Sequence, residues 1–133
     1  MKQSTILLGI CAAAIAGLGV WKFLPGGSEK QQLNVKLPEL SADAVQGRQI
    51  FQANCTACHG NAGNGTENGP PLIHKIYEPN HHGDMSFYMA AKQGVRSHHW
   101  KFGDMPPVEG VTDNDVTMIL AFVREVQRHN GIK

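Results

Sequence analysis

The sequence predicts an all-α fold, in which one small helical domain follows a hydrophobic helix at the N-terminus. Two observations support this prediction. An apolar run without charged residues extends from Thr5 to Trp21, and the segment that begins at Thr112 carries apolar residues at helical spacing. No βαβ pattern is present in the rest of the chain. Of the 133 residues, about 105 remain after the apolar run, enough for one small domain.

Residues 1–24 are predicted to be a signal anchor or a signal peptide. As a helix, the 17 residues of the apolar run would span about 25 Å, slightly less than a hydrocarbon core of about 30 Å. Ala14-Ile15-Ala16 is a small-x-small cleavage motif, but it lies in the middle of the run. Trp21-Lys22 is typical of an interfacial anchor, so we favour an uncleaved anchor. Either alternative exports the rest of the chain.

Residues 25–40 are predicted to be a linker, because Pro25-Gly26-Gly27-Ser28 stops a helix and a polar stretch follows. The domain is therefore expected at residues 41–133. Its first helix is expected to begin after Ser41, a suitable N-cap residue, and to reach about Ala53.

Two further helices are expected in the domain. Asp84 can cap a short helix over residues 85–93, with Gly94 in the C′ position. Thr112-x-x-Asp115 resembles a capping box and opens a final amphipathic helix that reaches about Gln127. The residues of this helix expected to face inward are Val116, Ile119, Leu120, Phe122, Val123 and Val126.

Cys55-Thr56-Ala57-Cys58-His59 matches C-x-x-C-H, the attachment signature of a c-type haem. Two thiols three positions apart can each form a thioether to a haem vinyl group. The histidine directly after them can place its imidazole on the iron. A zinc site completed by histidines remains an alternative. A four-thiolate zinc cage does not, because the only other cysteine, Cys11, lies in the apolar run.

The order of motifs over residues 41–128 resembles the class I cytochrome c family. Four features in chain order carry this resemblance. They are Gly47 and Phe51 before the cysteine motif, Gly69-Pro70-x-Leu72, Met105-Pro106 after a short helix and Gly94, and Ile119 and Phe122 on the last helix. The resemblance implies a small cytochrome c fold with three to four helices around one covalently bound haem c.

The resemblance also implies roles for individual residues. Cys55 and Cys58 would attach the haem by thioether bonds, and His59 would be the proximal iron ligand. Met105, 46 residues further on, would be the distal ligand. The carbonyl of Pro70 would accept the proton on the other ring nitrogen of His59 and fix its tautomer. A His/Met pair raises the reduction potential, because sulfur favours ferrous iron.

The other methionines and Trp100 are expected to have packing roles. Met118 falls in the final helix, and Met85 and Met89 lie four apart on a short helix. Trp100 is expected to pack on the haem, with its indole N–H either donating to a propionate or serving the core.

Seven histidines are many for such a chain, and the family pattern requires only His59. Five others fall between positions 74 and 99, and His129 is expected to be solvated. The five are His74, His81, His82, His98 and His99. Three interpretations remain open: surface and loop residues, ligation of the iron by His98 or His99 instead of Met105, and a second metal site for copper or zinc.

These expectations describe a one-electron carrier rather than an enzyme, acting in a bacterial respiratory chain. It would sit on the periplasmic side of the cytoplasmic membrane, or be soluble in the periplasm if residues 1–24 are cleaved. The expected partners are the membrane and redox proteins such as a terminal oxidase or a quinol–cytochrome c oxidoreductase. A formal net charge of +1 argues against nucleic-acid binding. Two alternatives are a haem subunit of a larger dehydrogenase and a haem protein with an additional histidine-rich copper-handling site.

Overall fold

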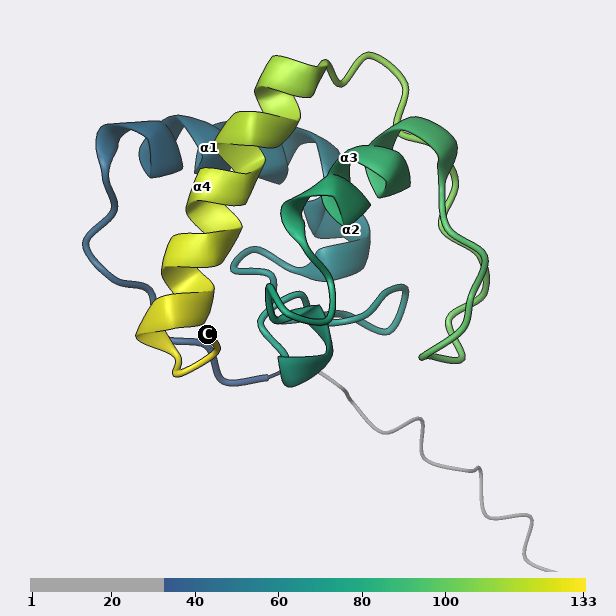
Figure 1. Ribbon diagram of the computed structural model, residues 1–133, viewed down its shortest axis with the longest axis horizontal. Helices are drawn as coiled ribbons and strands as arrows, with labels where there is room; N and C mark the ends of the chain where they lie inside the picture. Colours follow the sequence, from purple (N-terminus) through teal and green to yellow (C-terminus); the bar gives the residue numbers. More distant parts are fainter. Residues whose placement is uncertain (1–32) are drawn as a thin grey trace, which may run out of the picture.

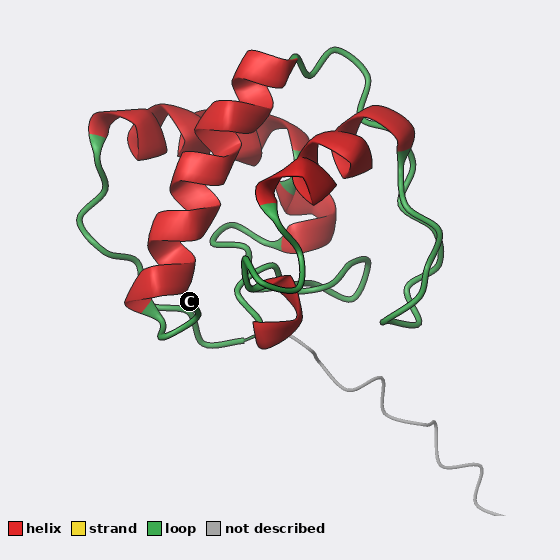
Figure 2. Cartoon of the chain, viewed as in Figure 1, coloured by secondary structure: helices red, strands yellow, loops and turns green. Residues whose placement is uncertain are grey.

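The structure, a computed structural model, describes residues 33–133, which fold into helices joined by loops (Figure 1). The helices are α1 (Ala42–Asn54), α2 (Thr56–His59), η1 (a 3₁₀ turn, Lys75–Tyr77), α3 (Asp84–Gln93) and α4 (Asp113–His129). Figure 2 shows no strand in this part of the chain, so the predicted all-α class is confirmed here. The predicted N-terminal helix, within residues 1–24, lies outside the described residues. Within 33–133, no helix combines the length and the hydropathy needed to cross a membrane.

Helices α1 and α4 cross each other and form the main helix pair (Figure 1). Helix α1 begins as predicted, since the hydroxyl of Ser41 accepts a hydrogen bond from the amide of Ala44 at 3.3 Å. Phe51 of α1 and Phe122 of α4 are fully buried, and their ring centroids lie 5.4 Å apart. Burying two phenylalanine side chains stabilises such a pair by several kcal/mol, at roughly 1.5–3 kcal/mol each.

The capping box predicted for α4 is present. The hydroxyl of Thr112 accepts from the amide of Asp115 at 3.2 Å, and the carboxylate of Asp115 accepts from the amide of Thr112 at 2.9 Å. All six residues expected to face inward are buried. The helix ends at His129, two residues beyond the predicted end at Gln127.

Helix α3 differs from its prediction in two respects. Its N-cap is Gly83, and the carboxylate of Asp84 lies 2.8 Å from Nε of Arg124 instead of capping the helix. Met85 is 68% exposed, so the expectation that it packs inside is wrong. Met89 lies on the wall of an apolar cavity beside α3, and Met85 does not.

Residues 33–40, the last part of the predicted linker, have no regular secondary structure and lie against the helical domain. The amide of Leu33 donates to the carbonyl of Asn64 at 2.8 Å. The main-chain amide of Lys36 donates to the side-chain oxygen of Asn130 at 3.0 Å, and the side-chain nitrogen of Asn130 donates to the carbonyl of Lys36 at 2.8 Å. This stretch is therefore attached both to the loop after α2 and to the end of α4.

A long loop that folds back on itself connects α3 to α4 (Figure 1). Its two arms are joined by a single antiparallel bridge, in which Val95 and Met105 each donate an amide to the other's carbonyl at 2.9 Å. The bridge fixes Met105 close to the end of α3.

Candidate functional site

The cysteine motif continues directly from α1. The amide of Cys55 donates to the carbonyl of Phe51 at 2.8 Å, and residues 56–59 form the single helical turn α2, which was not predicted. Residues four apart lie on the same side of a helix. Cys55 and His59 accordingly line one cavity, whereas Cys58 is exposed.

The two cysteine side chains have different surroundings and are not joined by a disulfide. Burial, together with the nearby Cys58, raises the pKa of the Cys55 thiol to about 11. Cys58 is held by its neighbours. Thr66 donates its hydroxyl to the Cys58 carbonyl at 2.7 Å, and a Cβ at Gly69 would lie only 2.8 Å from the Cβ of Cys58.

The imidazole of His59 is held in one tautomer. Only 8% of this residue is exposed, and its Nδ1 lies 2.8 Å from the carbonyl oxygen of Pro70. A carbonyl only accepts, so Nδ1 carries the proton and Nε2 is left with a free lone pair. Burial lowers the pKa of His59, and the hydrogen bond to Pro70 opposes this effect. The neutral ring that results is the form that binds a metal.

A cavity of about 660 Å³ opens between α2, α3, α4 and the long loop. This volume lies within the roughly 300–1,000 Å³ typical of cofactor sites. The apolar residues of its wall include Phe51, Leu72, Phe87, Val95 and Ile119. Cys55, His59, Pro70 and Met105 line it as well. An apolar cavity with a thiol, a free imidazole nitrogen and a thioether sulfur fits a haem, which needs an attachment point, axial ligands and a dry surrounding.

The backbone places Met105 on the wall of this cavity. Gly94 ends α3 with φ 75°, and a Cβ at this position would overlap the carbonyl of Met105. Glycine therefore permits both the left-handed turn and the close approach. Met89 of α3 lines the same cavity, so the wall offers two thioether sulfurs.

Trp100 and Tyr77 form a polar contact on the cavity wall. The indole N–H of Trp100 donates to the hydroxyl of Tyr77 at 3.1 Å. Of the two roles expected for this N–H, the structure shows a hydrogen bond within the protein. Burial raises the pKa of Tyr77, and the hydrogen bond from Trp100 partly offsets that effect.

A buried cation that was not predicted fixes the segment after η1. Arg124 of α4 donates to the carbonyl oxygens of Tyr77 at 2.7 Å and His82 at 2.6 Å. Its Nε forms an ion pair with the carboxylate of Asp84, and its Nη1 donates to the side-chain oxygen of Gln127 at 2.7 Å. Both Arg124 and Gln127 are buried on the inner face of α4. The sequence signal for this buried network was the presence of two polar residues, Arg124 and Gln127, on the otherwise apolar inward face of α4.

The structure brings four of the loop histidines together. The ring centroids of His81 and His82 are 4.7 Å apart, and both lie close to His99, at 5.1 and 5.2 Å. His98 is adjacent, 4.3 Å from His99. The pKa of His99 lies below its ordinary value, first because of partial desolvation and then because of charge on the neighbouring imidazoles.

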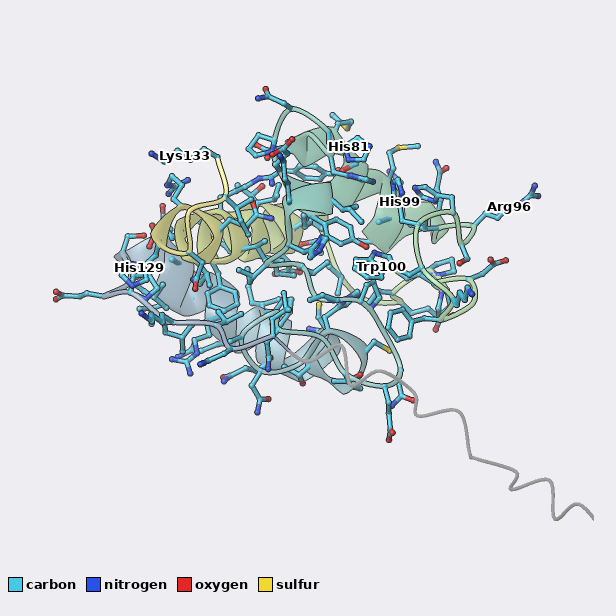
Figure 3. All side chains as sticks on the ribbon, turned by 90° about the horizontal axis from the view of Figure 1, so that it is seen from below. His81, Arg96, His99, Trp100, His129 and Lys133 are labelled. Carbon is cyan, nitrogen blue, oxygen red and sulfur yellow. The ribbon has the colours of Figure 1, made fainter. Side chains whose placement is uncertain are left out.

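Besides His59, two histidines lie outside this group. Nδ1 of His74 accepts from the amide of Ile76 at 3.2 Å and caps η1. His129 is exposed at the end of α4, and Figure 3 shows it at the left-hand end of the molecule, away from His81 and His99. The expectation that His129 is solvated is confirmed.

Residues 44–127 match the protein family described as cytochrome c. No curated protein and no solved structure matches the chain. The matched stretch covers more than half of the sequence and contains the cysteine motif, the cavity-lining residues of all four helices and the long loop. The chain therefore belongs to the cytochrome c family, which implies a covalently bound haem c.

Proposed function

We propose that this chain is a class I cytochrome with one haem c, and that it carries single electrons in a bacterial respiratory chain. The observation that carries the proposal is that His59 and Met105 line the same apolar cavity as Cys55. Haem c supplies the ferric/ferrous couple, while the protein supplies ligation, orientation and burial. His59 and Met105 would hold the iron from the cavity wall, so that the protein would rearrange little on electron transfer.

Each residue of the site has a distinct role in this proposal. Cys55 and Cys58 attach the haem covalently and keep it from dissociating. His59 offers Nε2 as a ligand, because its Nδ1 is committed to the carbonyl of Pro70. Met105 offers a thioether sulfur, which favours the ferrous state and raises the reduction potential.

Visible spectroscopy of the exported, haem-loaded protein tests the ligation. We expect a weak far-red sulfur-to-iron band in the ferric protein and no reaction of the ferrous protein with carbon monoxide. Met105→Leu should abolish the band and open the iron to carbon monoxide. Met89→Leu is the matched control, since Met89 is the other methionine on the cavity wall, and it should change neither property.

Other outcomes would replace the proposal. Low-spin iron without the far-red band would indicate ligation by a second histidine. High-spin iron that binds carbon monoxide in the unmodified protein would indicate an open site suited to catalysis or gas sensing. Loss of the band in Met89→Leu alone would assign the ligand to α3.

We further propose that the domain faces the periplasm, anchored by residues 1–24 as an uncleaved helix, and exchanges electrons with a terminal oxidase or a quinol–cytochrome c oxidoreductase. The apolar run from Thr5 to Trp21 supports an anchor. Membrane fractionation and N-terminal sequencing test it. An anchored chain stays with salt-washed membranes and retains Lys2, whereas a soluble chain that starts after Ala16 would show a cleaved signal.

A further inference from the structure

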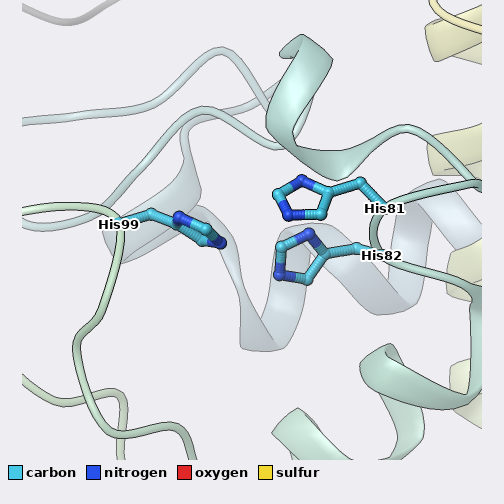
Figure 4. Close-up of side chains that lie close together, drawn as sticks. All are labelled: His81, His82 and His99. Atoms are coloured by element: carbon cyan, nitrogen blue, oxygen red, sulfur yellow. The ribbon is translucent and has the colours of Figure 1, made fainter.

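Three histidine rings converge at the edge of the cavity. His81, His82 and His99 each contribute one ring nitrogen, and these three nitrogens all lie within 4.8 Å of one another. Figure 4 shows His99 reaching from the long loop toward His81 and His82, which come from the segment after η1. His82 and His99 line the cavity, so the group lies at the rim of the proposed haem site and is separate from His59.

The hydrogen bonds of His81 and His82 leave one nitrogen of each ring available. Both Nδ1 atoms lie close to the carbonyl oxygen of Ile76, at 2.9 Å for His81 and 2.6 Å for His82. A carbonyl only accepts, so each Nδ1 carries a proton and each Nε2 keeps its lone pair. A main-chain carbonyl behind Nδ1 is the arrangement that orients metal-binding histidines in many proteins.

The main chain beneath these rings is fixed. The amides of His81 and His82 both donate to the carbonyl of Glu78, at 3.0 and 2.8 Å. The buried guanidinium of Arg124 binds the carbonyl of His82 at 2.6 Å. The segments that carry the ligands are thus held before any ion binds, which lowers the entropy cost of binding.

The loop that carries His99 is also braced. The amide of Ser97 donates to the carboxylate of Asp104 at 2.8 Å, and its hydroxyl donates to the carbonyl of Trp100 at 2.5 Å. His99 itself is exposed, so its ring can rotate by the small amount that metal coordination requires.

No carboxylate neutralises these rings in the part of the chain that the structure describes, where the single ion pair joins Arg124 to Asp84. If the three rings were protonated, their charges would repel at these distances. If they are neutral, they present lone pairs to a shared space. A cation bound between them would accept the three lone pairs.

We propose that His81, His82 and His99 bind one divalent transition-metal ion, with Cu²⁺ held more tightly than Zn²⁺. Imidazole suits both ions, and the general order of affinities places Cu²⁺ above Zn²⁺. Nitrogens bound to one tetrahedral ion at bond lengths near 2.1 Å lie about 3.4 Å apart. The three ring nitrogens lie within 4.8 Å of one another, so metal binding has to draw them together by up to about 1.4 Å, which rotation of the exposed His99 ring can supply. Three protein ligands leave at least one position for water.

Titration of the metal-free, haem-loaded full chain with Cu²⁺ tests the proposal, on protein prepared without a polyhistidine tag. A competing chromophoric chelator gives the affinity, and electron paramagnetic resonance counts the coordinated nitrogens. We expect one Cu²⁺ per chain with three imidazole nitrogens. His81→Ala and His99→Ala should each weaken binding by about 100-fold or more, above the 10- to 100-fold typical of losing an outer-shell partner. His129→Ala, at the exposed end of α4 and away from these histidines, should leave the affinity unchanged.

Four outcomes would overturn the proposal. The first is the absence of stoichiometric Cu²⁺ binding, and the second is binding that survives in both His81→Ala and His99→Ala. The third is displacement of Cu²⁺ by an equal concentration of Zn²⁺. The fourth is a changed iron ligation in metal-free His99→Ala, which would make His99 a haem ligand. Both substituted residues are exposed, and circular dichroism checks that the variants fold. The nitrogen count on the unsubstituted protein does not depend on any variant. Failure of the electron-carrier proposal would appear in the carbon monoxide test instead, so the two are distinguishable.

Discussion

Gly47 of α1 lies directly against the main-chain carbonyl of Met118 where α1 and α4 cross. A Cβ built at Gly47 would overlap that carbonyl and would lie 3.0 Å from the amide nitrogen of Ile119. A main-chain obstacle cannot rotate away, so the spacing of the two helices depends on the missing side chain. Gly47 is one of the residues that carry the resemblance to the family, and this geometry gives a physical reason for a glycine at that position.

Gly47→Ala should destabilise the haem-loaded protein by about 3 kcal/mol, the upper end of the usual cost of overpacking. Guanidinium unfolding followed by visible absorbance measures the loss. Gly83→Ala is the control, because Gly83 has an ordinary φ of −61° and a Cβ there would meet its nearest atom, the carbonyl oxygen of Pro79, at 3.6 Å. Equal effects of the two substitutions would contradict the close-approach argument.

The capping box of α4 should make stability depend on pH. Hydrogen bonds from the hydroxyl and then from the amide of Thr112 lower the pKa of Asp115 below its usual value of 3.8. The folded state therefore favours the ionised carboxylate of Asp115. The resulting stabilisation is present above pH 3.8, the pKa of the unfolded state, and is lost as the pH falls through the lower pKa of the folded state.

The stability difference between the unsubstituted protein and Asp115→Asn should accordingly be largest near neutral pH and shrink below about pH 4. Guanidinium unfolding at about pH 7, 5 and 3 measures it. Asp113→Asn removes a first-turn carboxylate that is not part of the capping box, and it should give a smaller difference. A difference for Asp115→Asn that does not vary with pH would rule out the titration as its cause.

Periodicity and end signals in the sequence predicted the helices well where local rules dominate. Ser41, Thr112 and Asp115 cap their helices as expected, and the inward face of α4 is buried as expected. The same rules failed at Asp84, because a long-range partner, Arg124, competes for its carboxylate. They also failed at Met85, since helical spacing does not say which side of a short helix is covered.

The residues of the haem site could be predicted from the sequence, but the histidine cluster at its rim could not. The cysteine motif and the resemblance named five residues. Four of them, Cys55, His59, Pro70 and Met105, line the cavity, whereas Cys58 is exposed beside it. The meeting of the histidine pairs was not predictable, because it depends on how two irregular loops fold. Sequence left it as one of three interpretations, and the hydrogen bonds to the carbonyl of Ile76 could not be read from residue types.

The contact between Trp100 and Tyr77 should couple the long loop to the turn at η1. Tyr77→Phe leaves the indole N–H of Trp100 without its partner, at a cost of about 1 kcal/mol. A double-mutant cycle with Trp100→Phe isolates the interaction, and we expect a coupling free energy of about 1 kcal/mol from guanidinium unfolding. Strict additivity, within about 0.3 kcal/mol, would show that the hydrogen bond does not contribute to stability.

Arg124 should couple the stability of the domain to the proposed metal site, because one guanidinium holds both Asp84 and the carbonyl of His82. Arg124→Met keeps the apolar stem and removes the charge, so it should cost about 3 kcal/mol in guanidinium unfolding. The Cu²⁺ affinity should fall by about tenfold, since the main chain beneath His82 loses its support. Arg128→Met, at an exposed position one turn further along α4, should leave the unfolding free energy within about 0.5 kcal/mol and the affinity unchanged. A destabilised Arg124→Met that bound Cu²⁺ with full affinity would show that the histidines hold their geometry without the guanidinium.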